Sequence, residues 1–309
     1  RSYFVNGLPI PPDFHGGEEN FRSVDYMAIP VPPMQTLATL LFDGVLWVGT
    51  FGRGLNRVDL RNGQVTRYRR PFGPGHTEAD DIVWSLHLDR RGQLWLGLQQ
   101  GLARLDPHTG RFSRHSLGIE RDTVLPINHI AEDAGGRLWL ATPEGLYQYD
   151  PDTRATRVFT HTGDAAGPSS NVLITLRFDP PGTLWIGTAE QVLNRLDVTT
   201  ETFTHYPLVT AAGQSLRSEG IWAIHRDITG MLWLGTGSGL SRFDPETATF
   251  RHFDTHDGLP GSVVYSIEAD AAQRLWLGTN LALDRFHPTG LGDGAEAPAR
   301  FRTIAPGDG

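Results

Sequence analysis

The chain has 309 residues, including 36 Gly, 21 Pro and no Cys, and its 27 basic and 35 acidic side chains give a net charge of −8. Its apolar share of 39% is too high for a disordered chain, although Gly and Pro are both enriched. The lack of Cys excludes disulfides, a thiol nucleophile and zinc sites with sulfur ligands. The acidic balance disfavours nucleic acid as a partner, because that binding draws on clustered cations. These quantities indicate a turn-rich globular protein.

No segment approaches the run of about 18 apolar residues that a membrane-spanning helix needs. The N-terminal segment also lacks the charged and then apolar pattern of a secretion signal. Because the chain begins at Arg1 rather than Met, we expect it to be a processed product or a piece of a longer protein.

One pentapeptide, Leu-Trp-x-Gly/Ala-x, recurs six times at intervals of 43 to 48 residues. Its Trp residues are Trp47, Trp95, Trp139, Trp185, Trp233 and Trp276. In five copies an Asp stands six residues before the Trp, with a turn between them: Asp89, Asp133, Asp179, Asp227 and Asp270. In the first copy Asp43-Gly44 takes the place of the longer turn, and Asp-Gly is a strong hairpin signal.

Each Trp strand is followed by two further expected strands. The third strand is typified by 101–106, and the fourth is expected to start near an aromatic residue: Phe112, Phe159, Phe203 or Phe250. Four short strands within this period are typical of a propeller blade. We therefore predict an all-β fold, a β-propeller of four-stranded antiparallel blades.

The expected organisation is one propeller over residues 1–309, with a strand segment at 1–33. The blades are expected at about 34–76, 77–122, 123–167, 168–214, 215–259 and 260–309. Residues 21–26 read as a fourth strand without a Trp strand before it, and 301–304 as the fourth strand of the sixth blade. We expect a seven-bladed ring whose last blade is shared with residues beyond 309; a six-bladed ring is the alternative.

The repeat Trp residues are expected to be core residues. Alternation along a strand places Trp47 and Gly49 on one face, and the small residue two positions after each Trp leaves room for a large neighbour. The repeat Asp residues are expected to form turns rather than to act as catalytic acids.

The unit formed by 262–270 and Leu275-Trp276-Leu277-Gly278-Thr279 resembles the two-component regulator propeller repeat. The resemblance covers about residues 35 to 290. Departures are Ala141 for Gly, Leu98 for Thr, and the loss of Gly-Leu after Trp185 and Trp276.

The resemblance implies a periplasmic sensor region of a bacterial inner-membrane regulator, followed in the full chain by a membrane span and a histidine kinase or diguanylate cyclase. It implies an unknown small ligand, with carbohydrate as one class, or a protein partner, and a homodimer of the full-length protein remains open. No cofactor and no enzymatic activity are expected in this region. The alternatives are a propeller lyase or hydrolase with a central channel site, as in streptogramin lyase, and a protein interaction scaffold.

Ligand recognition is expected on the face that carries the second-to-third and fourth-to-first strand connections, because loops on a rigid scaffold carry function. The loop candidates are Arg53, Gln99, Gln100, Glu144, Glu190 and Asn280. Five residues before the repeat Asp stand Ala38, Trp84, Asn128, Ile174, Trp222 and Tyr265, of which Trp84, Asn128, Trp222 and Tyr265 are ligand-binding candidates. These aromatics form either a stacking rim or packing between blades.

Other chemistry has weaker signals. His87, His129 and His225 lie near the first strands, but they lack metal-binding spacing, and no metal is expected. His115, His161, His205 and His252 read as solvated side chains at the outer rim. An enzyme would need His, Glu and Arg from adjacent blades to meet in the channel, whereas a scaffold would show a large exposed apolar patch.

Overall fold

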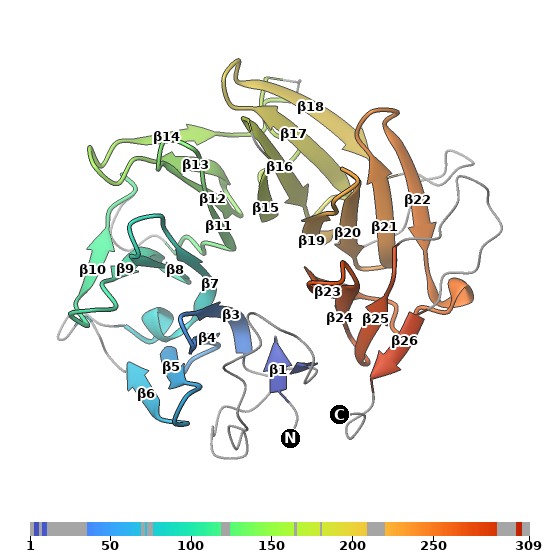
Figure 1. The fold of residues 1–309 in the computed structure, drawn as a ribbon. Coiled ribbons are helices and arrows are strands. Elements are labelled where there is room, and N and C mark those ends of the chain that lie inside the picture. The colour runs from blue at the N-terminus through green and yellow to red at the C-terminus, as the bar shows by residue number, and fades with distance from the viewer. Residues whose placement is uncertain are drawn as a thin grey trace.

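The computed structural model describes residues 3–5, 8–10, 36–68, 72, 77–118, 124–163, 166–179, 181–208, 220–288 and 301–304. These residues form six four-stranded antiparallel sheets arranged in a ring, and one two-stranded sheet (Figure 1). The predicted all-β propeller of four-stranded blades is therefore confirmed. In the described part of the chain, no helix is long and apolar enough to cross a membrane.

The six blades follow one another in chain order. The first three consist of β3 (Thr36–Phe42), β4 (Val45–Thr50), β5 (Leu55–Asp59) and β6 (Val65–Tyr68); β7 (Val83–Leu88), β8 (Leu94–Leu98), β9 (Gly101–Leu105) and β10 (Phe112–His115); and β11 (His129–Glu132), β12 (Leu138–Thr142), β13 (Gly145–Tyr149) and β14 (Thr156–Phe159). The next two consist of β15 (Leu173–Asp179), β16 (Thr183–Thr188), β17 (Val192–Asp197) and β18 (Thr202–Pro207); and β19 (Ile221–Arg226), β20 (Leu232–Thr236), β21 (Gly239–Asp244) and β22 (Thr249–Phe253). The sixth consists of β23 (Val264–Ala269), β24 (Leu275–Thr279), β25 (Leu283–Phe286) and β26 (Phe301–Ile304), and two short 3-10 helices are η4 (Glu78–Asp81) and η5 (Thr255–Asp257).

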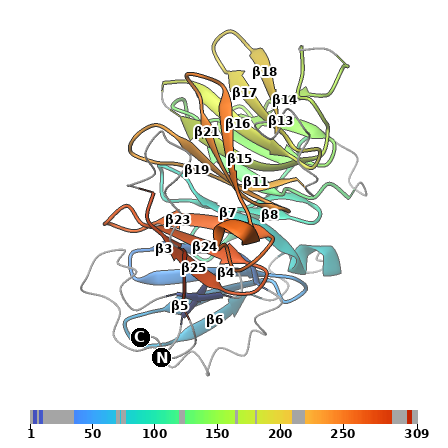
Figure 2. The ribbon, with the colours of Figure 1, turned by 90° about the vertical axis from the view of Figure 1, so that its right-hand side faces the viewer.

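Within each blade the strands pair in sequence order, so every blade is an antiparallel meander. The first strands of successive blades contact one another around the ring, from β3 to β7, β11, β15, β19 and β23. The fourth strands lie outermost (Figure 1). Seen from the side, the ring runs from the first blade at the bottom to the fourth at the top (Figure 2).

The small sheet of β1 (Tyr3–Val5) and β2 (Leu8–Ile10) lies between the last and the first blade (Figure 1). Its β1 contacts β3, and its β2 contacts β25. The described residues thus form a propeller of six four-stranded blades, and the sixth is completed by β26, as predicted from residues 301–304. The segment 21–26, predicted as part of a seventh blade, lies outside the described residues.

A hydrogen bond between side chains explains the recurring spacing of Asp and Trp. In five blades the indole Nε1 of the repeat Trp donates to the carboxylate of the Asp six residues before it, at 2.7 to 3.4 Å. In the Asp89, Asp133, Asp227 and Asp270 turns, the other carboxylate oxygen accepts amides of the turn. All six Trp side chains are at most 3% exposed, so the predicted core role is confirmed.

The Gly of the pentapeptide allows close contact between blades. A Cβ at Gly97 would lie 2.2 Å from Ser85 Oγ and 2.5 Å from the carbonyl oxygen of Ile127 in the next blade. The space beside this Gly is thus filled by a backbone carbonyl of the next blade and by the small Ser85 side chain, as well as by the large side chain that was expected. The Trp strands β4, β8, β12, β20 and β24 are buried along their whole length, because each is covered on both faces.

Two local predictions have different outcomes. The turn at Asp43-Gly44 joins Phe42 to its partner Val45, and both turn residues have positive φ, of 48° and 68°, as a tight hairpin requires. The expected start of a fourth strand near Phe159 is wrong, because β14 ends at this residue. The Phe159 ring packs on Trp139.

Candidate functional site

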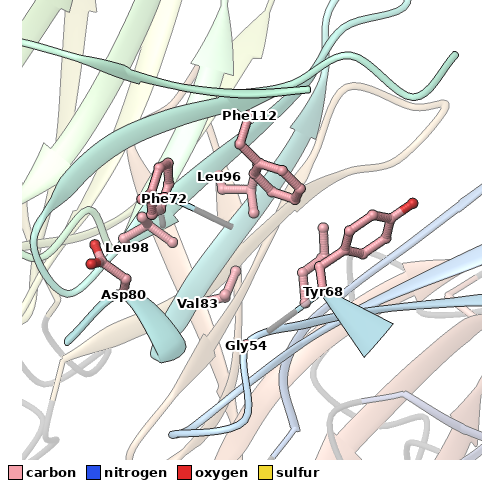
Figure 3. Close-up of a pocket in the computed structure, with 9 residues that line it drawn as sticks. Gly54, Tyr68, Phe72, Asp80, Val83, Leu96, Leu98 and Phe112 are labelled. Atoms are coloured by element: carbon pink, nitrogen blue, oxygen red, sulfur yellow. The ribbon is translucent and has the colours of Figure 1, made fainter. Parts of the chain in front are cut away.

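A central channel is the main candidate for a ligand site among the described residues. Its volume is about 760 Å³, and the first strands of all six blades line it. By contrast, the pocket between the first and second blades, lined by Tyr68, Val83 and Phe112, has a volume of about 10 Å³ (Figure 3). That space holds about one water molecule, so the channel is the candidate ligand site.

The sequence correctly places Trp84, Asn128, Trp222 and Tyr265 together on the channel wall. Trp84, Ile174, Trp222 and Tyr265 each lie in a β-bulge, because their two neighbours in the strand pair with consecutive residues of the Trp strand. An extra residue in a bulge is left unpaired and its side chain is redirected. The repeated bulge therefore brings the same position of these blades to the channel.

The first blade departs from the predicted register by one residue. Its bulge lies between Thr36 and Ala38, so Leu37 takes the equivalent position, while Ala38 pairs with Gly49. The cause is the short Asp43-Gly44 turn. It places the Asp six residues after the bulge position in this blade, instead of five as in the others. Both Leu37 and Ala38 line the channel.

The aromatic residues of the channel contact each other and leave polar groups available. The rings of Trp222 and Tyr265 pack edge to face, with centroids 5.9 Å apart, and Tyr265 is 45% exposed. The indole Nε1 of Trp222 is buried and has no hydrogen-bond partner among the described residues. Trp84 instead donates to Gln99 Oε1 at 2.6 Å. A half-buried aromatic pair with an unused donor suits a ligand with a flat apolar surface and an acceptor.

The six loop candidates lie on the expected connections, but none of them lines the channel. Gln99 holds Trp84 in place, and Gln100 Oε1 accepts from Thr77 Oγ1 at 3.0 Å. Glu190 Oε1 accepts from Ser170 Oγ at 3.1 Å. The backbone amides of Arg53 and Glu144 donate to Thr50 Oγ1 and Thr142 Oγ1, and Asn280 Oδ1 accepts from the amide of Val263 at 3.1 Å. Gln99 is thus the loop candidate that the structure connects to the channel.

Arg177, His225 and Glu268 form a polar layer on the channel wall that was not among the predicted ligand sites. They come from the fourth, fifth and sixth blades, and each stands opposite the repeat Trp of its own blade in the strand pairing. Their common signal in the sequence is a position eight residues before that Trp. Within the described residues, no hydrogen bond joins the three side chains.

Burial sets the charge state of this layer. It lowers the pKa of His225 to about 4, and the Arg177 cation adds to this shift while Asp227 opposes it. Burial likewise lowers the pKa of His129 to about 4, with a smaller contribution from His87. It raises the pKa of the Glu268 carboxyl, against the opposing effect of Arg177. Both imidazoles are therefore neutral at pH 7, and the ionisable groups that define the layer are Arg177 and Glu268.

The histidines that the sequence places near the channel are separated by their blades. His87 contacts Glu132 at 3.4 Å, and Arg90 binds the other oxygen of the same carboxylate at 2.8 Å. His129 also lines the channel, but it pairs with Ala141 and not with the repeat Trp, so it lies at a different level from His225. In the part of the chain that the structure describes, no group of three or more His, Asp or Glu side chains is placed to hold a metal ion.

The solvated outer rim predicted for four histidines is wrong for His115 and His252. The His115 ring is half-buried, its Nδ1 lies 2.7 Å from the Tyr149 hydroxyl, and it packs on Trp95. His252 lies 2.9 Å from Ser241 Oγ. Both rings contact side chains of other strands. Their burial therefore cannot be predicted from their position along the fourth strand.

The comparisons with known proteins agree with this fold. The family model described as two component regulator propeller matches residues 258–281. No curated protein sequence matches the chain.

Similar solved structures include two kinds of propeller. The extracellular domain of a hybrid two component system from B. thetaiotaomicron has a TM-score of 0.69 and 21% identity, over 89% of this chain and 35% of that chain. Virginiamycin B lyase from Staphylococcus aureus has a TM-score of 0.67 and 15% identity, over 89% and 86%. This chain thus spans about a third of the former protein. It is a β-propeller that carries the two component regulator propeller repeat, as its sequence predicts.

Proposed function

We propose that this chain is the extracytoplasmic sensory propeller of a bacterial membrane-bound signal-transduction regulator. Its central channel is the ligand site, and the signal passes to an output domain, a histidine kinase or a diguanylate cyclase, elsewhere in the full protein. The family match at 258–281 and the similar fold of an extracellular sensor domain support the class. The observation that carries the binding role is the bulge repeated around the channel, which brings Trp84, Trp222 and Tyr265 to the wall that Asn128 also lines.

The proposed role of this region is binding without catalysis. Arg177, His225 and Glu268 are the residue types that a lyase would need, and they come from adjacent blades, as the enzyme alternative requires. General acid–base catalysis also needs groups within hydrogen-bond reach of each other or of the substrate. The aromatic side chains on the same wall, Trp84, Trp222 and Tyr265, favour recognition of a ligand.

The binding role predicts that Trp222→Ala weakens ligand binding with little change in melting temperature. The alternative, packing between blades, predicts a lower melting temperature instead. Both are measured on the same variant, by thermal unfolding and by calorimetric titration with a panel of neutral sugars, acidic sugars, amino acids and dipeptides. The matched control is Phe42→Ala, because Phe42 is 50% exposed on a first-to-second strand turn, away from the channel. Equal effects of the two substitutions on affinity would contradict the channel site.

A further inference from the structure

Two channel side chains of opposite charge have no hydrogen-bond or ion-pair partner among the described residues. Arg177 and Glu268 both line the channel, but within the described residues neither makes a hydrogen bond or an ion pair of 4.0 Å or less. Most other charged groups of the described inner strands are engaged, such as Arg226 with Asp179 and Glu132 with Arg90. The two channel charges are therefore available to a ligand.

Arg177 is the more constrained of the two groups. Its Nε is buried and has no acceptor among the described residues. Asp179 and Glu268 act on it only through space, and Arg226 opposes them. Leaving a buried donor of a charged group unpaired is costly, and a guanidinium binds a carboxylate through two parallel hydrogen bonds. The wall at Arg177 is thus suited to a planar anion.

Glu268 supplies the opposite charge two blades away. Its side chain is accessible from the channel, but the surrounding wall partly desolvates it and raises its pKa, while the nearby Arg177 cation opposes that shift. Between them on the fifth blade stands the neutral His225 imidazole, which completes the same layer without adding charge. A carboxylate that faces the channel without a partner among the described residues is suited to a cationic donor such as an ammonium group.

We propose that the channel binds a small zwitterion, a free amino acid or a short peptide, with its carboxylate on Arg177 and its ammonium group on Glu268. This inference rests on the proposed function and specifies the ligand class of the same channel. A ligand with only one charge leaves the other wall group desolvated without a partner, and a monoanion also meets the Glu268 carboxylate. The remainder of the ligand extends toward Trp222 and Tyr265, whose rings offer an apolar surface.

The first experiment changes the ligand and leaves the protein intact. The 309-residue chain is titrated with the standard L-amino acids and with glycine-containing dipeptides. Each compound that binds is then compared with its carboxamide, which lacks the anion, and its N-acetyl form, which lacks the cation. Loss of one charge-assisted interaction is expected to weaken binding by about 10- to 100-fold. If both derivatives bind as tightly as the parent compound, or if no amino acid or dipeptide binds, the inference is overturned.

The second experiment assigns each charge to its residue. Arg177→Gln is expected to weaken binding of the parent compound and to leave the affinity for its carboxamide unchanged. Glu268→Gln is expected to weaken binding of the parent compound and to leave the affinity for its N-acetyl form unchanged. The matched controls are Arg157→Gln and Glu201→Gln, which disrupt an exposed ion pair of 2.6 Å outside the channel. A melting curve for each variant shows that it is folded. Equal losses for parent and derivative with either channel variant would contradict the assignment.

A sugar panel distinguishes failure of the proposed ligand class from failure of the channel as the binding site. If a sugar binds in a manner sensitive to Trp222→Ala while no amino acid or dipeptide binds, the zwitterion is wrong and the channel site stands. If no compound of either panel shows binding that depends on Trp222, both the ligand class and the channel site are wrong.

Discussion

The indole Nε1 of Trp95 donates a hydrogen bond of 2.7 Å to Asp89 Oδ2, across the turn that joins β7 to β8. The other oxygen of the same carboxylate accepts the amides of Arg91 and Gln93 at 2.9 and 2.8 Å. One buried side chain thus fixes both the turn and the Trp of the next strand. The recurrence of this bond in five blades is the physical reason for the six-residue spacing in the sequence.

Asp89→Ala is therefore expected to lower the free energy of unfolding by about 2–4 kcal/mol, because it leaves the buried indole donor and two turn amides without acceptors. The measurement is denaturant unfolding of the two proteins. The control is Asp106→Ala, since Asp106 binds His108 and Thr109 of its own exposed turn and no buried Trp. If both substitutions cost the same, the bond to Trp95 contributes nothing.

Trp185→Ala is expected to cost about 3–5 kcal/mol of stability, because it leaves a cavity in a closely packed blade junction. Trp185 is 2% exposed, and its ring lies 5.9 Å from that of Phe243. Denaturant unfolding measures the loss, and Trp185→Phe serves as the milder comparison. A loss below about 1 kcal/mol would show that this Trp is not a core residue.

Gly97→Ala is expected to destabilise the protein by about 1–3 kcal/mol, because the added Cβ overlaps the backbone of the next blade. The third blade provides the matched control, since Ala141 already occupies the same position there. Ala141→Gly is expected to cost at most about 1 kcal/mol, through the added flexibility of the unfolded chain. Melting curves of the two variants compare them directly. A Gly97→Ala protein as stable as the parent would show that the blades can separate at this junction.

Stability is expected to fall as the pH is lowered from about 6.5 toward 4. His115, His129 and His225 have pKa values lowered from 6.5 to about 4, mainly by burial. In this interval the unfolded chain binds protons that the folded protein excludes, so protonation favours unfolding. At pH 7 all three rings are neutral in the folded state, and the stability that they support is fully present.

The measurement is the melting temperature between pH 7 and pH 4.5. His225→Gln removes one of the three buried imidazoles and is expected to make the decrease shallower. A melting temperature that stays constant over this interval would show that the imidazoles are not buried in neutral form.

The site was predictable where its residues occupy a repeated position. Trp84, Trp222 and Tyr265 stand at one distance from the repeat Asp, and the structure places all three on the channel wall. The same rule fails for the first blade, where Leu37 replaces Ala38, because the tight two-residue turn places Asp43 one residue further from the bulge. The rule also says nothing of what surrounds a side chain, so the burial of His115 was missed.

The sequence alone determines the strands, the turns and the blades, because the same local features recur: a Trp strand and a small residue at the blade junction in all six blades, and a turn carboxylate bound to the Trp in five. The tertiary structure decides which of the alternating side chains share a space. Arg177 and Glu268 belong to blades that are not neighbours, and neither has a recognisable motif. They share a channel because six first strands pack around one axis, and this arrangement is long-range packing that no local pattern records.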